Sequence, residues 1–277
     1  MKIYAFADES SASVEGQIDA LKRNKLDGLE IRNVDGTNVS EITVDKATEV
    51  KNRLKSEGLK VWSVGSPIGK IDIKKDDFNK HIELFKHTLS VANALEAENM
   101  RIFSFYIPED DNYDDYKNEV IDRLGTLLEL SAGSGVDLCH ENEKGIFGDN
   151  EKRCKLLFES LPSLKGIFDP ANFVQCGVDT LLAWEELKEH IKYLHIKDSL
   201  KSGEIVPAGE GDGNIGQIIK AYKALGGNAV TLEPHLAVFD GLAALEREGE
   251  KSNVGGYKFE SNEAAFDAAC KALEKIL

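Results

Sequence analysis

Eight short apolar segments alternate along the chain with eight segments of helical periodicity, and this alternation limits the fold more than any other feature. Runs of apolar, β-branched and aromatic residues predict strands within residues 2–8, 26–33, 58–66, 99–107, 136–143, 164–172, 192–198 and 228–236. Amphipathic periodicity predicts helices within residues 15–25, 44–58, 80–95, 118–135, 150–161, 179–191, 216–227 and 262–277. This unbroken alternation over roughly 250 residues predicts a closed parallel (β/α)8 barrel, the TIM barrel, with its active site at the C-terminal ends of the strands.

The connections between the predicted elements support the barrel. Gly58, Gly135 and Gly226 end predicted helices just before strands, and glycine tolerates the left-handed conformation of a helix C-cap. A doubly wound open sheet is the alternative, but no GxGxxG motif follows the first strand to favour it. No proline-rich linker or low-complexity segment divides the chain, so residues 1–277 are predicted to form a single TIM-barrel domain.

Charge and cysteine usage restrict the partners and the compartment. The formal net charge of -15 disfavours nucleic acid and anionic membrane surfaces as partners, because both are bound through lysine and arginine. The four cysteines are scattered without CxxC spacing, as expected in a reduced compartment. The sequence shows no signal-peptide pattern and no uncharged apolar run of about 18 residues. We therefore expect a cytoplasmic protein that does not enter a membrane.

Ionisable side chains gather at the predicted C-terminal ends of the last four strands. These ends carry His140, Glu141, Asn142, Glu143, Asp169, Asn172, His195, Lys197, Asp198, Glu233 and His235. Because side chains alternate along a strand, one residue from each strand can point to a common site, and the best set is Glu141, Asp169, His195 and Glu233. Three carboxylates packed together repel one another unless a cation offsets their charge. Carboxylates and an imidazole without a thiolate suit Mn²⁺, Mg²⁺ or Co²⁺, and Zn²⁺ is also compatible.

Several of these residues have simpler interpretations. A lone carboxylate after a strand commonly caps a helix or lies in a loop, and Asp198 is interpreted as a cap or as an acceptor behind the site. Lys197 shares a face with His195 and is either a surface lysine or a substrate contact. His140 has the opposite strand parity to Glu141 and is predicted to be structural. The histidines on predicted helices are predicted to be surface or packing residues, and they are His81, His87 and His190.

Five motifs resemble those of a known superfamily over essentially the whole chain. They are "LCHENEKGIFGD", "FDPANF", "YLHIKD", "PAGEGDGNI" and "TLEPH". The sequence thereby resembles the xylose isomerase-like TIM-barrel superfamily, which contains sugar isomerases and epimerases, inosose and dehydroshikimate dehydratases, and endonuclease IV-type enzymes. The resemblance implies that Glu141, Asp169, His195 and Glu233 bind one divalent metal and that Glu141 and Glu233 double as acid/base groups. Asn172 stands where many members of the superfamily carry a histidine. The "PAGEGDGNI" loop is either a glycine-rich turn or a ligand contact.

The expected activity is that of a divalent-metal-dependent isomerase or epimerase of a small sugar, polyol or related hydroxy-carbonyl compound, acting through an enediolate. A dehydratase of the same fold is the alternative, followed by a non-catalytic sugar-binding barrel. Endonuclease IV-like chemistry is disfavoured, because it uses a histidine-rich trinuclear zinc site and a basic surface. We expect Mn²⁺ as the metal and an unphosphorylated sugar-like small molecule as the substrate. A homo-oligomer is left open. The predicted substrate-binding residues are Lys197, Asn172, Glu143 and His235, and further candidates for lining the pocket are Glu30, Arg32, Ser66, Lys70 and Tyr106.

The segment of residues 235–262 after the last strand is much longer than the usual βα loop of about 2 to 6 residues. Because it leaves from the strand that carries Glu233, we expect it to fold over the barrel mouth and exclude water from the site. A surface excursion and a dimer contact are the alternatives. Truncation of residues 249–256 is expected to lower turnover much more than metal affinity.

Overall fold

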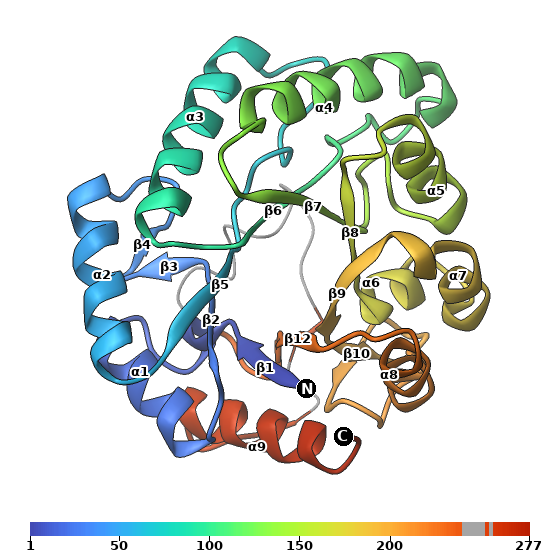
Figure 1. Cartoon of the computed structure of the whole chain (residues 1–277). Helices are drawn as coiled ribbons and strands as arrows, with labels where there is room; N and C mark the ends of the chain where they lie inside the picture. Colours follow the sequence, from blue (N-terminus) through green and yellow to red (C-terminus); the bar gives the residue numbers. More distant parts are fainter. Residues whose placement is uncertain (240–252, 255–256) are drawn as a thin grey trace.

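The computed structural model describes residues 1–239, 253–254 and 257–277. Within these residues, eight parallel strands close into a barrel in the order β1-β12-β9-β8-β7-β6-β5-β2, as Figure 1 shows. Their bounds are β1 Lys2–Ala5, β2 Gly28–Ile31, β5 Lys60–Val64, β6 Asn99–Ile102, β7 Asp137–Glu141, β8 Lys165–Phe168, β9 Ile191–Ile196 and β12 Ala229–Leu232. Each lies inside one of the predicted strand segments, except that β9 begins one residue before its segment. The prediction of a (β/α)8 barrel is confirmed.

Helices surround the barrel, and each predicted helical segment overlaps one, although α1, α3, α4 and α8 begin one or two residues before their segments (Figure 1). Their bounds are α1 Val14–Arg23, α2 Val44–Ser56, α3 Phe78–Ala94, α4 Lys117–Ser131, α5 Glu151–Ser160, α7 Thr180–Leu187, α8 Ile215–Ala224 and α9 Asn262–Glu274. Most of them begin at a polar side chain that accepts a backbone N–H of the first turn, which offsets the unpaired donors at a helix N-terminus. The side chains that do so are Ser13, Thr43, Asp77, Asn150, Asp179 and Ser261. These caps explain why the helices start where they do.

Some short elements were not predicted from the sequence. The helix α6, Pro170–Gln175, follows β8 directly, and Asp169 is its N-cap. Two-stranded hairpins follow β2 and β9, namely β3 Asn33–Val34 with β4 Thr37–Asn38 and β10 Asp198–Ser199 with β11 Ile205–Val206. The 3-10 helices are η1 Ala7–Glu9, η2 Tyr113–Tyr116 and η3 Lys188–His190. Elements of two to six residues are too short to show a period in the sequence, so the spacing of apolar residues does not predict them.

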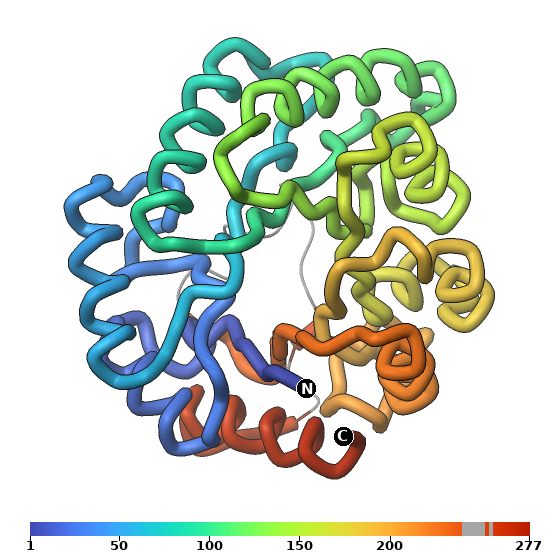
Figure 2. The backbone as a smooth tube through the Cα atoms, viewed as in Figure 1, coloured from blue at the N-terminus to red at the C-terminus, as the bar shows by residue number. Residues whose placement is uncertain are grey.

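The chain runs once around the barrel, and Figure 2 shows that its first and last elements meet. β1 pairs with β12 in parallel register from Lys2 opposite Ala229 to Ala5 opposite Leu232. The closing helix α9 packs against α1 and η1. None of the described helices is long and apolar enough to cross a membrane.

The barrel interior changes from apolar to ionisable along the axis. Near the N-terminal ends of the strands, an apolar layer fills the interior and is composed of Tyr4, Trp62, Cys139, Ile167, Tyr193 and Ala229. The rings of Tyr4 and Trp62 stack with centroids 5.0 Å apart. The buried ionisable residues Glu30, Arg101, Glu141 and His195 lie in the second half of β2, β6, β7 and β9, and further ones follow the C-terminal ends of barrel strands. The fold therefore places its buried charges at the end where barrel enzymes carry their active sites.

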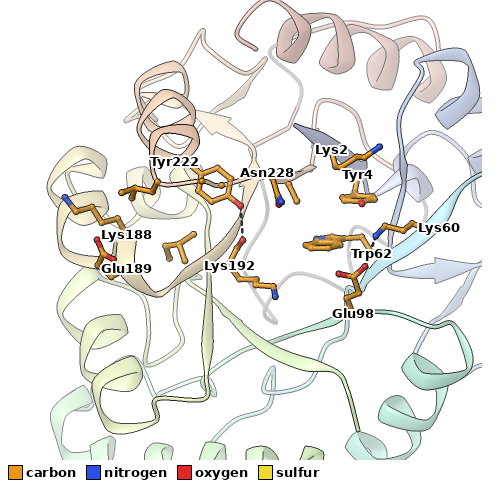
Figure 3. A pocket seen from close by; sticks show the side chains of 15 residues that line it. Lys2, Tyr4, Lys60, Trp62, Glu98, Lys188, Glu189, Lys192, Tyr222 and Asn228 are labelled. Atoms are coloured by element: carbon orange, nitrogen blue, oxygen red, sulfur yellow. Dashed lines mark hydrogen bonds and ion pairs between the residues drawn. The ribbon is translucent and has the colours of Figure 1, made fainter. Parts of the chain in front are cut away.

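A cavity of about 630 Å³ lies at the opposite, N-terminal end of the barrel and is shown in Figure 3. Its lysines are already paired with carboxylates, since Lys2 Nζ lies 2.6 Å from Asp27 and Lys60 Nζ lies 2.7 Å from Glu98. The described residues that line it include no histidine and no group of converging carboxylates. We therefore place the candidate active site at the other end of the barrel.

Candidate functional site

The structure brings together the four residues predicted to hold a metal. One oxygen or nitrogen atom from each of Glu141, Asp169, His195 and Glu233 lies within 4.8 Å of the corresponding atoms of the other three. Glu141 ends β7, Asp169 follows β8, His195 lies near the end of β9, and Glu233 follows β12. These four strands are consecutive neighbours in the barrel. We call this set the quartet, and all four of its side chains are buried.

His195 is held on both sides by carboxylates. Its Nδ1 lies 2.9 Å from Glu141 Oε1 and 3.2 Å from Glu233 Oε2, while its Nε2 lies 3.0 Å from Glu30 Oε2. Burial opposes the charged imidazolium, but Glu141 and Glu30 outweigh burial, so the pKa of His195 is raised well above its usual value. Without a metal, His195 is therefore a cation surrounded by three carboxylates.

Each glutamate of the quartet also contacts a buried arginine. Arg101 Nη1 lies 3.2 Å from Glu141 Oε2, and Arg32 Nη1 lies 3.5 Å from Glu233 Oε1. Burial would raise the pKa of Glu141, but the charges of His195 and Arg101 outweigh it and lower that pKa to about 2. The pKa of Glu233 is likewise held well below its usual value, because the charge of Lys197 and the hydrogen bond and charge of His195 outweigh burial. Both glutamates are therefore carboxylates at neutral pH.

Asp169 and Lys197 form a buried ion pair inside the site. Lys197 Nζ lies 2.9 Å from Asp169 Oδ2 and 3.5 Å from Glu233 Oε2. Burial raises the pKa of Asp169 to about 7 against the opposing charge of Lys197. The side chain of Lys197 is 5% exposed. Its interpretation as a surface lysine is wrong, because its ammonium lies among the quartet.

The quartet suits a divalent cation by its donor set. Asp169 Oδ2 is buried and faces the Lys197 ammonium at 2.9 Å, while Asp169 Oδ1 accepts the N–H of Asn172. Oxygen ligands with one imidazole fit Mn²⁺, Mg²⁺ or Co²⁺, and Zn²⁺ as well. A second cluster, Glu9 with Glu233 and His235, also lies within 4.8 Å. That cluster offers three groups instead of four and shares Glu233 with the quartet, and both of its glutamates contact the same guanidinium, that of Arg32. The quartet is therefore the better candidate metal centre.

The four residues predicted to bind substrate all lie around the quartet or its rim. Lys197 contacts the quartet directly, and Asn172 Nδ2 lies 3.4 Å from Glu141 Oε1 and 2.8 Å from the carbonyl of Asn142. Glu143 pairs with Lys70 at 2.9 Å and is partly exposed. His235 Nε2 lies 3.4 Å from Glu233 Oε1, and its backbone N–H donates to Glu9.

Two residues considered for the pocket lining have other roles. Glu30 is fully buried behind His195, and Ser66 Oγ donates to the carbonyl of Arg101. Neither side chain is exposed to solvent, so neither lines an open pocket. Both belong to the support of the site.

The residues predicted to be structural have protein partners. His140 Nε2 lies 2.9 Å from Ser104 Oγ, and His81 Nε2 accepts the N–H of Gly69 at 2.8 Å. Asp198 accepts four backbone N–H groups, from Ser199, Gly209, Gly211 and Gly213. The "PAGEGDGNI" loop is therefore organised around Asp198, which acts as an acceptor behind the site.

Three charged residues of the site were not found from the sequence. Arg101 was missed because it lies in the middle of an apolar strand, although an arginine in a barrel strand that should face inward is itself a signal. Asp8 and Glu9 follow β1 in η1 and bind Arg32, with 2.9 Å between Asp8 Oδ2 and Arg32 Nε. They stand at a strand end like the quartet, and that position was the available signal.

Most of the segment predicted to cover the barrel mouth lies outside the described residues, which exclude 240–252 and 255–256. At its start, the Phe239 ring stacks on His235 with centroids 5.6 Å apart. Near its end, Tyr257 Oη donates to Glu210 Oε2 at 2.5 Å. The lid stays a prediction.

The fold and the quartet define a TIM barrel with a candidate metal centre at the C-terminal ends of its strands. The family model of the xylose isomerase-like TIM barrel matches residues 18–252, and the chain belongs to this family. No curated protein sequence gives a significant match to the chain.

Several solved structures share the fold. The crystal structure of the probable 3-DHS dehydratase AsbF, involved in petrobactin synthesis in Bacillus anthracis, has a TM-score of 0.75 at 18% identity and covers 99% of both chains. That of D-allulose 3-epimerase from Methylomonas sp. in complex with D-allulose has a TM-score of 0.74 at 16% identity, over 100% of this chain and 96% of that one. The structure of the IOLI protein with a zinc atom has a TM-score of 0.72 at 15% identity, over 100% and 98% of the two chains. At these identities the likeness concerns the fold.

Proposed function

We propose that the chain is a divalent-metal-dependent isomerase or epimerase of a small sugar, polyol or related hydroxy-carbonyl compound. The observation that carries the proposal is the meeting of Glu141, Asp169, His195 and Glu233 at the C-terminal ends of four neighbouring strands. The quartet would hold one ion, with Mn²⁺ as the first choice. When bound, a divalent ion supplies a Lewis acid that polarises a carbonyl and stabilises negative charge on oxygen.

Glu141 and Glu233 are the proposed acid and base groups. They come from β7 and β12, the outer two of the four strands that carry the quartet, and β8 and β9 lie between them. A substrate carbon held between the two carboxylates presents a different face to each. One glutamate removes the proton from this carbon, and the charge left behind delocalises onto the neighbouring carbonyl oxygen as an enediolate. The other glutamate returns a proton to the opposite face in epimerisation, or to the next carbon in isomerisation.

The surrounding cations keep these carboxylates in place and ionised. Arg101 contacts Glu141, while Arg32 and Lys197 contact Glu233. A general base must be ionised before it accepts a proton, and the lowered pKa of both glutamates suits that step. Structures of the same fold support a sugar-like substrate, since one of them is an epimerase with D-allulose bound.

Hydrogen exchange into the substrate tests the proposal. Candidate sugars would be incubated with the protein and Mn²⁺ in deuterated water, and deuterium at carbon would be followed by NMR and mass spectrometry. We expect deuterium uptake together with an epimer or isomer, and loss of both after removal of metal with a chelator. Glu141→Gln should abolish uptake. The matched control is Glu98→Gln, because Glu98 lies at the opposite end of the barrel.

Two results would overturn the assignment. A dehydrated product would identify a dehydratase, in which the same enediolate expels a β-hydroxyl group, and the probable dehydratase of this fold makes that the first alternative. Binding of sugar without any exchange would identify a non-catalytic sugar-binding barrel.

A further inference from the structure

A buried carboxylate outside the quartet contacts His195 from behind. Glu30 lies on β2 and is fully buried. In the barrel, β1 and β12 separate β2 from β9 on one side, so the Glu30 side chain reaches His195 through the interior. A carboxylate is costly to bury unless hydrogen bonds and a cation compensate it. Three side chains that contact Glu30 provide this compensation.

All three partners approach Glu30 as hydrogen-bond donors. Tyr193 Oη donates to Glu30 Oε1 at 3.0 Å, and Ser63 Oγ donates to the same oxygen at 3.2 Å. The other oxygen, Oε2, lies 3.0 Å from His195 Nε2. A carboxylate accepts hydrogen bonds and has none to donate, so the hydrogen in this last contact belongs to Nε2. In the metal-free protein the contacts of Nδ1 with Glu141 and Glu233 place a hydrogen on Nδ1 as well, and a metal at the quartet would replace that hydrogen.

The imidazole ring of His195 is fixed in this orientation. Its ring packs against Phe6 at 5.3 Å in an edge-to-face geometry and against Tyr193 at 5.6 Å. Nδ1 faces the quartet glutamates at 2.9 and 3.2 Å, while Nε2 faces away from them toward Glu30. Rotating the ring to exchange the two nitrogens would turn Nε2 away from Glu30 and break that contact.

We infer that Glu30 is a positioning residue that keeps the hydrogen on Nε2 of His195 and thereby reserves Nδ1 as the ligand atom. The inference rests on the proposed function, because it concerns the metal that the quartet would hold. Metal-binding histidines in general donate their second N–H to such a partner, and loss of the partner weakens metal binding by about 10-fold to 100-fold. Glu30 would therefore act on the metal through His195 without touching it.

The first test measures Zn²⁺ affinity by competition with a chelator. Glu30→Gln keeps the shape but removes the charge, and Glu30→Met removes the acceptor. We expect both variants to bind Zn²⁺ about 10-fold to 100-fold more weakly than the wild type. The matched control is Tyr193→Phe, which removes one donor to the same carboxylate and leaves the contact with His195 intact, so its affinity should stay close to that of the wild type. Circular dichroism checks that each variant is folded.

The second test needs no variant and distinguishes positioning from a merely structural role. Imidazole ¹⁵N spectra of the Zn²⁺-loaded wild type should show His195 with a hydrogen on Nε2 and the metal on Nδ1. In Glu30→Gln this Nε2–H signature should weaken or shift. A loaded wild type with the hydrogen on Nδ1 would overturn the inference, and so would Glu30 variants with wild-type Zn²⁺ affinity. A wild type that takes up neither Zn²⁺ nor Mn²⁺ would overturn the metal site itself, which separates failure of the proposed function from failure of the role of Glu30.

Discussion

Glu233 lies where the charges of the site are most concentrated, in contact with Arg32, His195, Lys197 and His235. As a proposed acid/base group it is expected to be required for turnover. Glu233→Gln keeps the side-chain shape and should lower kcat by at least about 100-fold at saturating Mn²⁺. The circular dichroism spectrum should stay that of the wild type. A glutamine variant with near-normal kcat would rule out the acid/base role.

Arg101 is one of the three charged residues of the site that sequence patterns did not indicate, and its replacement should lower the stability of the fold. It is 3% exposed, and its guanidinium contacts Glu141 and the carbonyl of Gly65. Arg101→Met leaves a buried carboxylate without this partner, which should lower the free energy of unfolding by about 3 kcal/mol or more. Urea unfolding of the metal-free protein measures this. Arg101→Lys is the control and should lose less, because it keeps a positive charge; equal stability of the methionine variant and the wild type would contradict the prediction.

At the scale of elements, Asp198 holds the loop between β10 and α8. Its Oδ2 accepts the N–H groups of Gly209 and Gly211, and its Oδ1 accepts those of Ser199 and Gly213. Asp198→Asn replaces one acceptor oxygen with an NH2 group, so two backbone donors lose their partner. We expect the free energy of unfolding to fall by about 2 to 4 kcal/mol, measured by urea unfolding. Wild-type stability of Asp198→Asn would show that water satisfies these donors.

The contact between α3 and the loop after β5 should depend on pH. His81 accepts the N–H of Gly69, and burial lowers its pKa to about 4 from an ordinary 6.5. The unfolded chain therefore binds a proton more readily than the native state below pH 6.5. This contribution to stability is complete above pH 6.5 and is lost as the pH falls from 6.5 to about 4, by roughly 3 kcal/mol in total.

A His81→Gln variant isolates that contribution, because glutamine can accept the same hydrogen bond without titrating. The difference in unfolding free energy between wild type and variant should change between pH 7 and pH 4 in the direction that disfavours the wild type. A difference that is constant across this range would show that His81 titrates normally.

At the scale of the whole molecule, metal binding should stabilise the barrel. The quartet joins four strands that are far apart in the sequence, and a ligand that binds only the native state raises the free energy of unfolding by about 2.7 kcal/mol at 100 times its Kd. Mn²⁺ should therefore raise Tm, and a chelator should reverse the rise. Asp169→Ala should abolish the shift, whereas Glu9→Gln should retain it, because Glu9 belongs only to the second cluster. A shift lost equally in both variants would place the metal elsewhere.

The sequence by itself determined the barrel and the strand ends that carry the quartet. Eight strand segments and eight helical segments were recognisable because the spacing of apolar residues and the residues at element ends are local properties of the sequence. The (β/α)8 arrangement follows from the alternation of these segments. Glu141, Asp169, His195 and Glu233 were recognisable because barrel topology brings successive strand ends to one face. Which of their side chains can point inward follows from the alternation along each strand.

Only the tertiary structure decided which groups surround the quartet. Glu30 and Arg101 lie in the interior of strands, and an inward position in a strand does not specify that Glu30 contacts His195 or that Arg101 contacts Glu141. Lys197 was ambiguous for the same reason, since its burial depends on neighbours contributed by β8 and β12. Contacts between residues distant in sequence arise only when the barrel closes, because closure fixes which side chains share its interior.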